Sequence, residues 1–148
     1  MTALAKDRKT NKLGVDDTAD PLLLSFPVLA NAVFFGGAIV VTDANGFAKP
    51  GLTSTTVKAW GRCEKAVNNT GGADGAVQVL VRQGVFFYEN SSAGDLIAAD
   101  DVGKVVFIVD DQTVALTDGG ATRSKAGVVY AVDSFGKVGV FLGIAGLY

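Results

Sequence analysis

The amino-acid sequence predicts an all-β fold, either a small β-sandwich or a barrel-like domain. The chain has 19 glycines among 148 residues, a share well above the usual value of about 7%, and helix-favouring Glu, Met and Gln are scarce. Short valine-rich runs alternate with segments of Gly, Asn and Asp, which is typical of many short strands joined by turns. We expect roughly eight to ten strands and at most one short helix.

The stretch Asp74–Leu116 shows this plan most clearly. The runs Val77–Arg82 and Val85–Tyr88 are rich in β-branched and aromatic residues, and they predict a strand pair or one bent strand. Gly84 marks the bend. Val105–Val109 is apolar without a polar break, which predicts a strand covered on both faces in the middle of a core.

Turn residues divide the rest of the chain. Asp110–Thr113 predicts a tight turn into a strand at Val114–Leu116, because Asp side chains can bind nearby backbone donors where the chain reverses. Asp43–Gly46 and Asp133–Gly136 predict two further reversals, the second inside a hairpin. A helical turn or two is expected over Leu96–Val102, stopped by Gly103. The remaining strands are expected at Leu22–Val28, Val33–Phe35 continuing past Gly36-Gly37 to Ala38–Val41, Phe47–Pro50, Trp60–Val67, Gly127–Val132 and Lys137–Leu142.

The length predicts one folded domain with an extended N-terminal arm. Residues 1–20 are polar and mixed in charge, without the apolar periodicity that a core would need. Residues 21–148 are expected to form a single β-rich domain. We infer that the arm lies on a neighbouring chain, and the alternative of packing on its own domain or in a crystal contact stays open.

The net charge and the single cysteine limit the classes of binding partner and the cellular compartment that we expect. The net charge is -2 and the isoelectric point is near 4.9, so no broad cationic surface favours nucleic acid or an anionic membrane. No signal peptide is recognisable, and no apolar run approaches the roughly 20 residues of a membrane span. The single Cys63 cannot form an internal disulfide. We expect a protein made and kept in the cytoplasm, or in something assembled there.

The residue types offer no catalytic, cofactor or metal site. The chain lacks histidine, which removes the commonest general base and metal ligand. Cys63 is expected in the core. The pairs Asp16-Asp17, Asp100-Asp101 and Asp110-Asp111 are expected in turns and caps, because adjacent residues on a strand point to opposite faces. Gly71–Gly75 precedes a strand, so a loop is favoured over a phosphate cradle. Core filling is favoured over base or sugar stacking for the aromatic residues Phe34, Phe35, Phe86, Phe87 and Tyr88.

Several segments follow one another in a distinctive order. They are Ala5–Thr10, Asn68–Ala76, Val77–Val81 with Gly84-Val85-Phe86, Ala99–Lys104 and Val109–Val114. This order resembles a family of small capsid decoration, or cement, proteins of tailed bacteriophages and prophages. The likeness covers most of the chain, and it is carried by turn-and-strand patterns of moderate specificity.

The resemblance implies a non-enzymatic β-rich protein without a cofactor. It would bind the outer surface of a phage head, in a virion assembled in the bacterial cytoplasm, and bridge neighbouring major capsid subunits. The partners implied are the phage major capsid protein and other copies of the chain, as a dimer or trimer, with no direct contact to nucleic acid or membrane. The arm residues expected to contact the capsid or a neighbour are Lys6, Arg8, Lys9, Thr10 and Lys12.

Two other functions stay open at this point. A carbohydrate-binding or adhesin-like module would require Trp60 and Tyr88 to be exposed together on one surface. A structural role in the tail or the head-to-tail connector would use the same kind of β fold. A hydrolase is disfavoured because no plausible general base is present.

Overall fold

The computed structural model describes residues 23–143, and this part of the chain is an all-β protein. The expected arm over residues 1–20 lies outside the described residues. Two 3-10 helices, η1 (Ala93–Asp95) and η2 (Ala99–Asp101), interrupt the strands, and the described part contains no α-helix. The strands are β1 (Leu23–Pro27), β2 (Val33–Phe34), β3 (Ile39–Thr42), β4 (Ala48–Pro50), β5 (Lys58–Cys63), β6 (Val67–Asn68), β7 (Gln78–Arg82), β8 (Gly84–Asn90), β9 (Val105–Ile108), β10 (Thr113–Ala115), β11 (Lys125–Val132) and β12 (Val138–Leu142).

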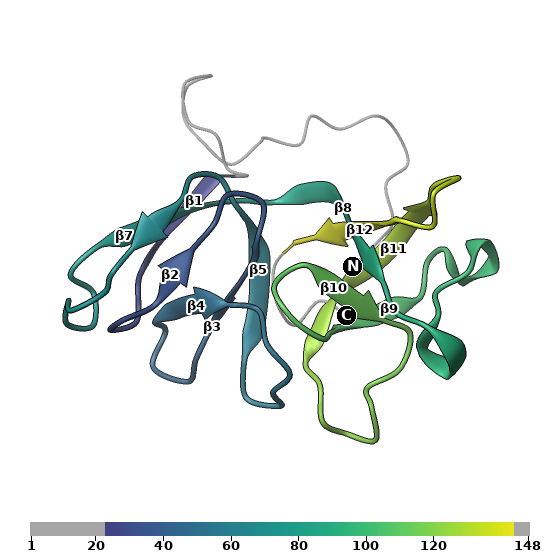
Figure 1. The fold of residues 1–148 in the computed structure, drawn as a ribbon, viewed down its shortest axis with the longest axis horizontal. Helices are drawn as coiled ribbons and strands as arrows, with labels where there is room; N and C mark the ends of the chain where they lie inside the picture. Colours follow the sequence, from purple (N-terminus) through teal and green to yellow (C-terminus); the bar gives the residue numbers. More distant parts are fainter. Residues whose placement is uncertain (1–22, 144–148) are drawn as a thin grey trace, which may run out of the picture.

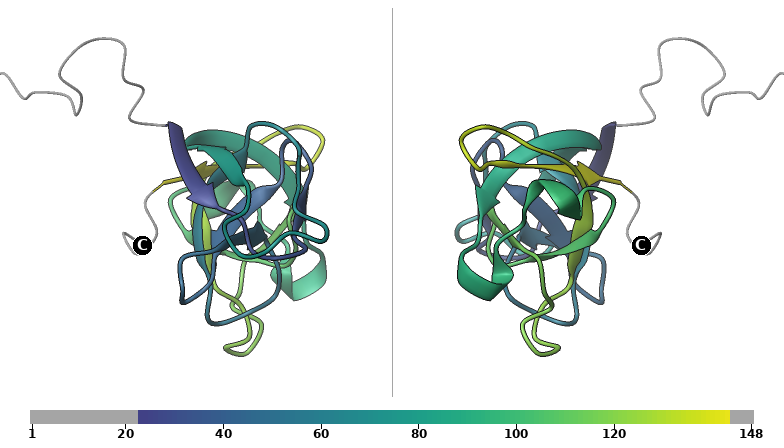
Figure 2. Two further views of the ribbon diagram at one scale, coloured as in Figure 1. Left: turned by 90° about the vertical axis from the view of Figure 1, so that its left-hand side faces the viewer. Right: turned by 90° about the vertical axis from the view of Figure 1, so that its right-hand side faces the viewer.

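The strands form two lobes that lie side by side (Figure 1). One lobe is a five-stranded sheet in the order β1-β7-β5-β3-β4, accompanied by the two-stranded ribbon β2-β6. The other is a closed barrel in the order β10-β8-β12-β11-β9. The predicted all-β, barrel-like fold is therefore confirmed. The long loop between β10 and β11, coloured yellow-green, projects from the lower edge of the molecule in Figures 1 and 2.

The junction of β7 and β8 carries the chain from one lobe to the other. β7 pairs with β1 and β5 in the open sheet, whereas β8 pairs with β12 and β10 in the barrel. Gly84 has a φ of 151°, a conformation that residues with a side chain rarely adopt. The predicted bend at Gly84 is confirmed, and the two runs are successive strands of different sheets.

Strand β3 forms a wall between two hydrophobic cores. Ile39 and Val41 pack into the barrel core, whereas Val40 packs into the core of the open sheet. All four β3 residues are buried, because side chains alternate between two faces that are both covered. The prediction of a doubly covered strand at Val105–Val109 was wrong. There, β9 alternates between half-buried and buried residues.

The predicted turns are confirmed by hydrogen bonds from backbone amides to aspartate side chains. Asp43 Oδ1 accepts from the amides of Asn45 and Phe47. Asp133 Oδ1 accepts from two amides in the β11–β12 hairpin, and Asp110 Oδ1 accepts from the amide of Gln112.

The expected strand Trp60–Val67 ends early. β5 stops at Cys63, and Val67 belongs to the separate ribbon strand β6. Local contacts explain the break. The Glu64 carboxylate lies 2.6 Å from Arg62 and 2.8 Å from Arg82, and Cys63 Sγ donates to the carbonyl of Lys65 at 3.2 Å. These contacts stabilise a turn where the periodicity suggested a continuous strand.

The expected helix over Leu96–Val102 is replaced by the two short 3-10 turns, which lie on either side of Ile97. Asn90 explains the difference. Its Nδ2 donates to the carbonyl of Ile97 at 2.8 Å, and its Oδ1 accepts from the amide of Ile97 at 3.0 Å. Ile97 is buried in the barrel core. Because both of its backbone groups are bound to a side chain on β8, Ile97 cannot join a helical ladder.

Candidate functional site

Large apolar side chains at the surface are the most distinctive feature of the described residues. The prediction that five aromatic residues fill the core is confirmed for Phe34 and Tyr88, which are buried, and Phe86 is half-buried against the barrel core. It was wrong for the other two. Phe35 is 70% exposed and Phe87 is 56% exposed.

Phe87 belongs to an exposed ladder along β8 and β12. The paired residues are Val85 with Phe141 and Phe87 with Gly139. Directly opposite residues of an antiparallel pair share one face of the sheet, so these side chains lie together on the outside of the barrel. Phe141 is 47% exposed. Gly139 leaves space for the aromatic ring, because a Cβ at this position would stand 3.2 Å from Phe87 Cε1.

Strand β11 extends this surface on the other side of β12. Val128 lies opposite Phe141, and the register shifts at a bulge between Val129 and Ala131. Tyr130 occupies the bulge and is 66% exposed. We define the barrel apolar face as Val85, Phe87, Tyr130 and Phe141. An exposed apolar surface built on three neighbouring strands is typical of an interaction site.

A concave site adjoins this face between the two lobes. Its volume is about 510 Å³, and we call it the Phe35–Phe87 pocket. Backbone hydrogen bonds fix its wall, since Gly37 N donates to the carbonyl of Cys63 at 2.9 Å and Glu89 N to that of Gln112 at 2.8 Å. The lining residues are Phe35, Gly36, Gly37, Ala38, Phe87, Tyr88, Glu89, Asp111 and Gln112.

The polar part of the Phe35–Phe87 pocket is acidic. Burial, followed by the nearby charge of Asp110, raises the pKa of Asp111 above its ordinary value. No basic side chain among residues 23–143 forms an ion pair with Asp111, whereas Glu89 pairs with Lys137. The pocket therefore joins two exposed aromatic rings to a partly buried carboxylate, an arrangement that suits a cationic or hydrogen-bonding partner with apolar flanks.

A second concavity of about 400 Å³ lies between β5 and the β10–β11 loop. Lys58, Arg123 and Lys125 are among its lining residues. Arg123 already binds Asp95 at 3.0 Å and the carbonyl of Thr117 at 3.2 Å. Its guanidinium therefore holds the β10–β11 loop against η1, which gives Arg123 a structural role at this concavity.

The aromatic pair expected of a carbohydrate-binding platform does not form. Tyr88 is buried inside the barrel. Trp60 is half-buried, packs against Phe26 with the rings tilted by 42° and their centroids 4.9 Å apart, and donates from Nε1 to Thr42 Oγ1 at 2.8 Å. The two side chains are therefore not exposed together on one surface.

The side chains of Cys63, Tyr88 and Asp101 are buried in the fold. Cys63 is buried as predicted, and burial raises the pKa of its thiol, which disfavours the nucleophilic thiolate. Burial likewise raises the pKa of Tyr88. The Asp101 carboxylate accepts from the amide of Ala98 and pairs with Lys104, both at 2.7 Å. Within residues 23–143, no group of three or more Cys, Asp and Glu side chains is placed to hold a metal ion.

The contact residues predicted from the sequence, Lys6, Arg8, Lys9, Thr10 and Lys12, lie outside the described residues. Their role stays a prediction. Phe87, Tyr130 and Phe141 were not predicted as contact residues. The sequence offered no signal for the exposure of Phe141, because Val138–Leu142 has no polar residue on either face, and only the fold shows Val140 buried and Phe141 exposed.

Comparisons with known protein families, curated proteins and solved structures find no match to this chain. In the part of the chain that the structure describes, no helix has the length and apolar character needed to cross a bilayer.

Proposed function

We propose that this chain is a structural virion protein that binds the outside of a phage head and cements neighbouring major capsid subunits. The observation that carries the proposal is the barrel apolar face. It presents Phe87, Tyr130 and Phe141 on three adjacent strands. Exposed aromatic residues are among the residue types that dominate protein interfaces. The order of turns and strands that resembles capsid cement proteins supports the same function.

The architecture around this face also supports a contact function. The strands that carry it belong to a closed barrel, and their inner sides are anchored by the buried Val129, Val138, Val140 and Leu142. A close-packed interior holds the outer side chains in fixed positions. A preformed surface loses little conformational freedom on binding, which favours affinity. Repetition over a symmetric shell multiplies a modest interface many times.

The proposal is tested on purified heads of the phage or prophage that encodes the chain, after removal of the bound protein. Added protein is expected to return to the outer shell at symmetry-related positions, which cryo-electron microscopy locates, and to raise the temperature at which heads lose their DNA. Deletion of residues 1–13 is expected to weaken attachment while leaving the folded domain intact. A protein that never binds the shell would contradict the proposal, and one found on the tail or connector would move it to that part of the virion.

One observation favours a second candidate, a carbohydrate-binding module. The Phe35–Phe87 pocket joins exposed aromatic rings to the polar side chains of Asp111 and Gln112, and sugars present both apolar faces and hydroxyl groups. A glycan screen at millimolar concentration, read by chemical-shift changes at Gly36 and Gly37, distinguishes the candidates. Sugar binding that is lost on Phe35→Ala would favour the module, and an absence of shifts would remove it.

A further inference from the structure

We infer that the Phe35–Phe87 pocket binds the basic stretch Lys6–Lys12 of a second copy of this chain. The inference rests on the proposed function for its setting on the shell, and it assigns the arm a partner: another copy instead of the capsid protein. It makes the pocket and the arm two halves of one interface between copies.

Charge complementarity identifies the occupant. Residues 6–12 contain four cations and one carboxylate, and Leu4 and Leu13 flank them. The pocket offers the carboxylate of Asp111 without a basic partner among residues 23–143, next to the exposed rings of Phe35 and Phe87. A Lys or Arg side chain can pair with the carboxylate while its aliphatic stem covers a ring. An acidic or uniformly polar segment would neither form an ion pair with the Asp111 carboxylate nor cover the exposed rings.

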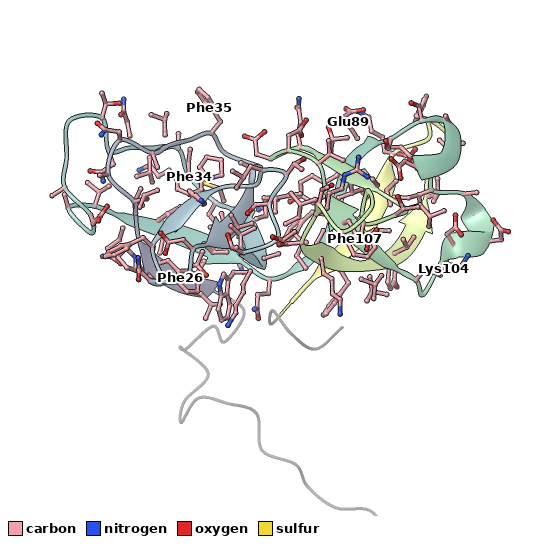
Figure 3. All side chains as sticks on the ribbon, turned by 90° about the horizontal axis from the view of Figure 1, so that it is seen from below. Phe26, Phe34, Phe35, Glu89, Lys104 and Phe107 are labelled. Carbon is pink, nitrogen blue, oxygen red and sulfur yellow. The ribbon has the colours of Figure 1, made fainter. Side chains whose placement is uncertain are left out.

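The positions of the arm and the pocket favour a second copy over the same chain. Residues 1–22 join the described domain at Leu23, the first residue of β1, which pairs with Arg82. Figure 3 shows Phe26 of β1 on the side of the molecule opposite Phe35 and Glu89. Lys12 precedes Leu23 by eleven residues, which span at most roughly 40 Å when fully extended. The segment can leave the domain directly toward a neighbour, whereas its own pocket requires it to pass around the body of the protein.

This geometry has a consequence for assembly. The arm is attached to β1 on one side of the domain and the pocket lies on the other, so a contact between the arm of one copy and the pocket of another is head-to-tail and uses two different surfaces. Contacts of this type close into rings when the rotation between copies permits it. A ring of copies tied by arms would bridge several capsid subunits at once, which is the arrangement a cement protein needs.

Disulfide trapping in the full-length protein tests the inference without any capsid. One variant carries Lys9→Cys and a second carries Gln112→Cys, an exposed position at the pocket. The native Cys63 is buried. We expect mixing to give a covalent dimer that joins positions 9 and 112, identified by mass spectrometry. The matched control replaces Gln112→Cys by Ser134→Cys, an exposed position in the β11–β12 turn. The 9–112 link should form about ten-fold faster than the 9–134 link or better, because docking raises the local concentration of the two thiols.

Four further measurements make the result decisive. Phe35→Thr and Asp111→Lys are each expected to slow 9–112 trapping to the control rate, and added salt should slow it as charges are screened. A chain that carries both Lys9→Cys and Gln112→Cys should give covalent oligomers. If it closes within one chain, the occupant is its own arm and the inference is wrong. Equal rates for the 9–112 and 9–134 links would also overturn it.

Uptake by heads is measured separately, so the two proposals can fail independently. Normal uptake without 9–112 trapping rejects the arm–pocket contact alone. Trapping in a protein that no shell takes up supports the contact and rejects the capsid function.

Discussion

Replacing Phe141 by threonine tests whether the barrel apolar face binds the shell. Phe141 is 47% exposed, so about 90 Å² of the roughly 200 Å² of an aromatic side chain is open to a partner. At about 25 cal/mol per Å², complete coverage of this area contributes about 2 kcal/mol to binding. The corresponding weakening on Phe141→Thr is roughly thirty-fold in Kd. Threonine suits a strand, so the barrel should keep its fold.

The assay is a binding isotherm on stripped heads, with bound protein quantified after sedimentation. The matched control is Phe135→Thr, which also removes one exposed ring. Phe135 is 90% exposed in the β11–β12 turn and lies outside the barrel apolar face. We expect the control to bind like the parent, and Tyr130→Thr to weaken binding at least as much as Phe141→Thr, because Tyr130 is more exposed on the same face.

The pattern of effects decides the outcome. Parent-like binding by Phe141→Thr and Tyr130→Thr, with thermal unfolding unchanged, would refute the assignment of this face to the shell. Weakened binding by Phe135→Thr alone would move the contact to the hairpin turn. A fall in the unfolding temperature for Phe141→Thr would indicate a stability effect, and the Tyr130→Thr result would then decide.

Three predictions concern stability, each measured by urea unfolding. Asn90→Ala removes both side-chain bonds to the backbone of buried Ile97, so it should cost about 2 kcal/mol or more, and a cost below about 0.5 kcal/mol would contradict the bridging role. Burial raises the pKa of Asp111. The protonated carboxyl therefore contributes stability to the fold that is fully present below the ordinary pKa and is lost as pH rises through the folded pKa. Asp111→Asn should therefore raise the urea midpoint at pH 7 and lose this gain below the ordinary pKa of 3.8; an equal gain at both pH values would exclude charge as the cause. The hydrogen bond from Arg62 lowers the pKa of Glu64, so the stability it contributes is present above the ordinary pKa of 4.5 and lost as pH falls through the folded pKa. Glu64→Gln should lower the midpoint at pH 7, and the difference should close in acid; a constant difference would point to packing.

The sequence predicted local structure better than strand partners. Turns at Asp43, Asp110 and Asp133 follow from side-chain chemistry within a few residues, so a single sequence contains the information. The pairing of β1 with β7 joins residues more than fifty positions apart, and no periodicity within either strand specifies it. The helix over Leu96–Val102 failed for a different reason: Asn90 lies only seven residues before Ile97, but no sequence pattern shows that its side chain binds the Ile97 backbone.

Whether an aromatic residue on a strand is exposed depends on which of the two alternating faces it occupies, and the sequence alone does not determine this. Phe86 and Phe87 point to opposite faces, and which of them faces the core depends on how β8 continues after Gly84. A shift of one residue would bury Phe87 and expose its neighbours. Phe35 is exposed because it begins the turn before β3, where Ala38 N donates to its carbonyl at 3.2 Å. The sequence could therefore supply the aromatic residues of the site, but their exposure required the fold.

Close packing in the interior of the protein holds the outer side chains in fixed positions, which suits them to stable binding. β3 contributes to both cores, with Ile39 and Val41 on one side and Val40 on the other. A relative motion of the lobes would have to disrupt close packing on both faces of this strand, and such interiors resist deformation. Phe35, from the lobe of the open sheet, and Phe87, from the barrel, are therefore held at a fixed separation across the pocket. A binding partner meets a surface whose shape is already set, so substitutions on that surface should change affinity while leaving the fold as it is.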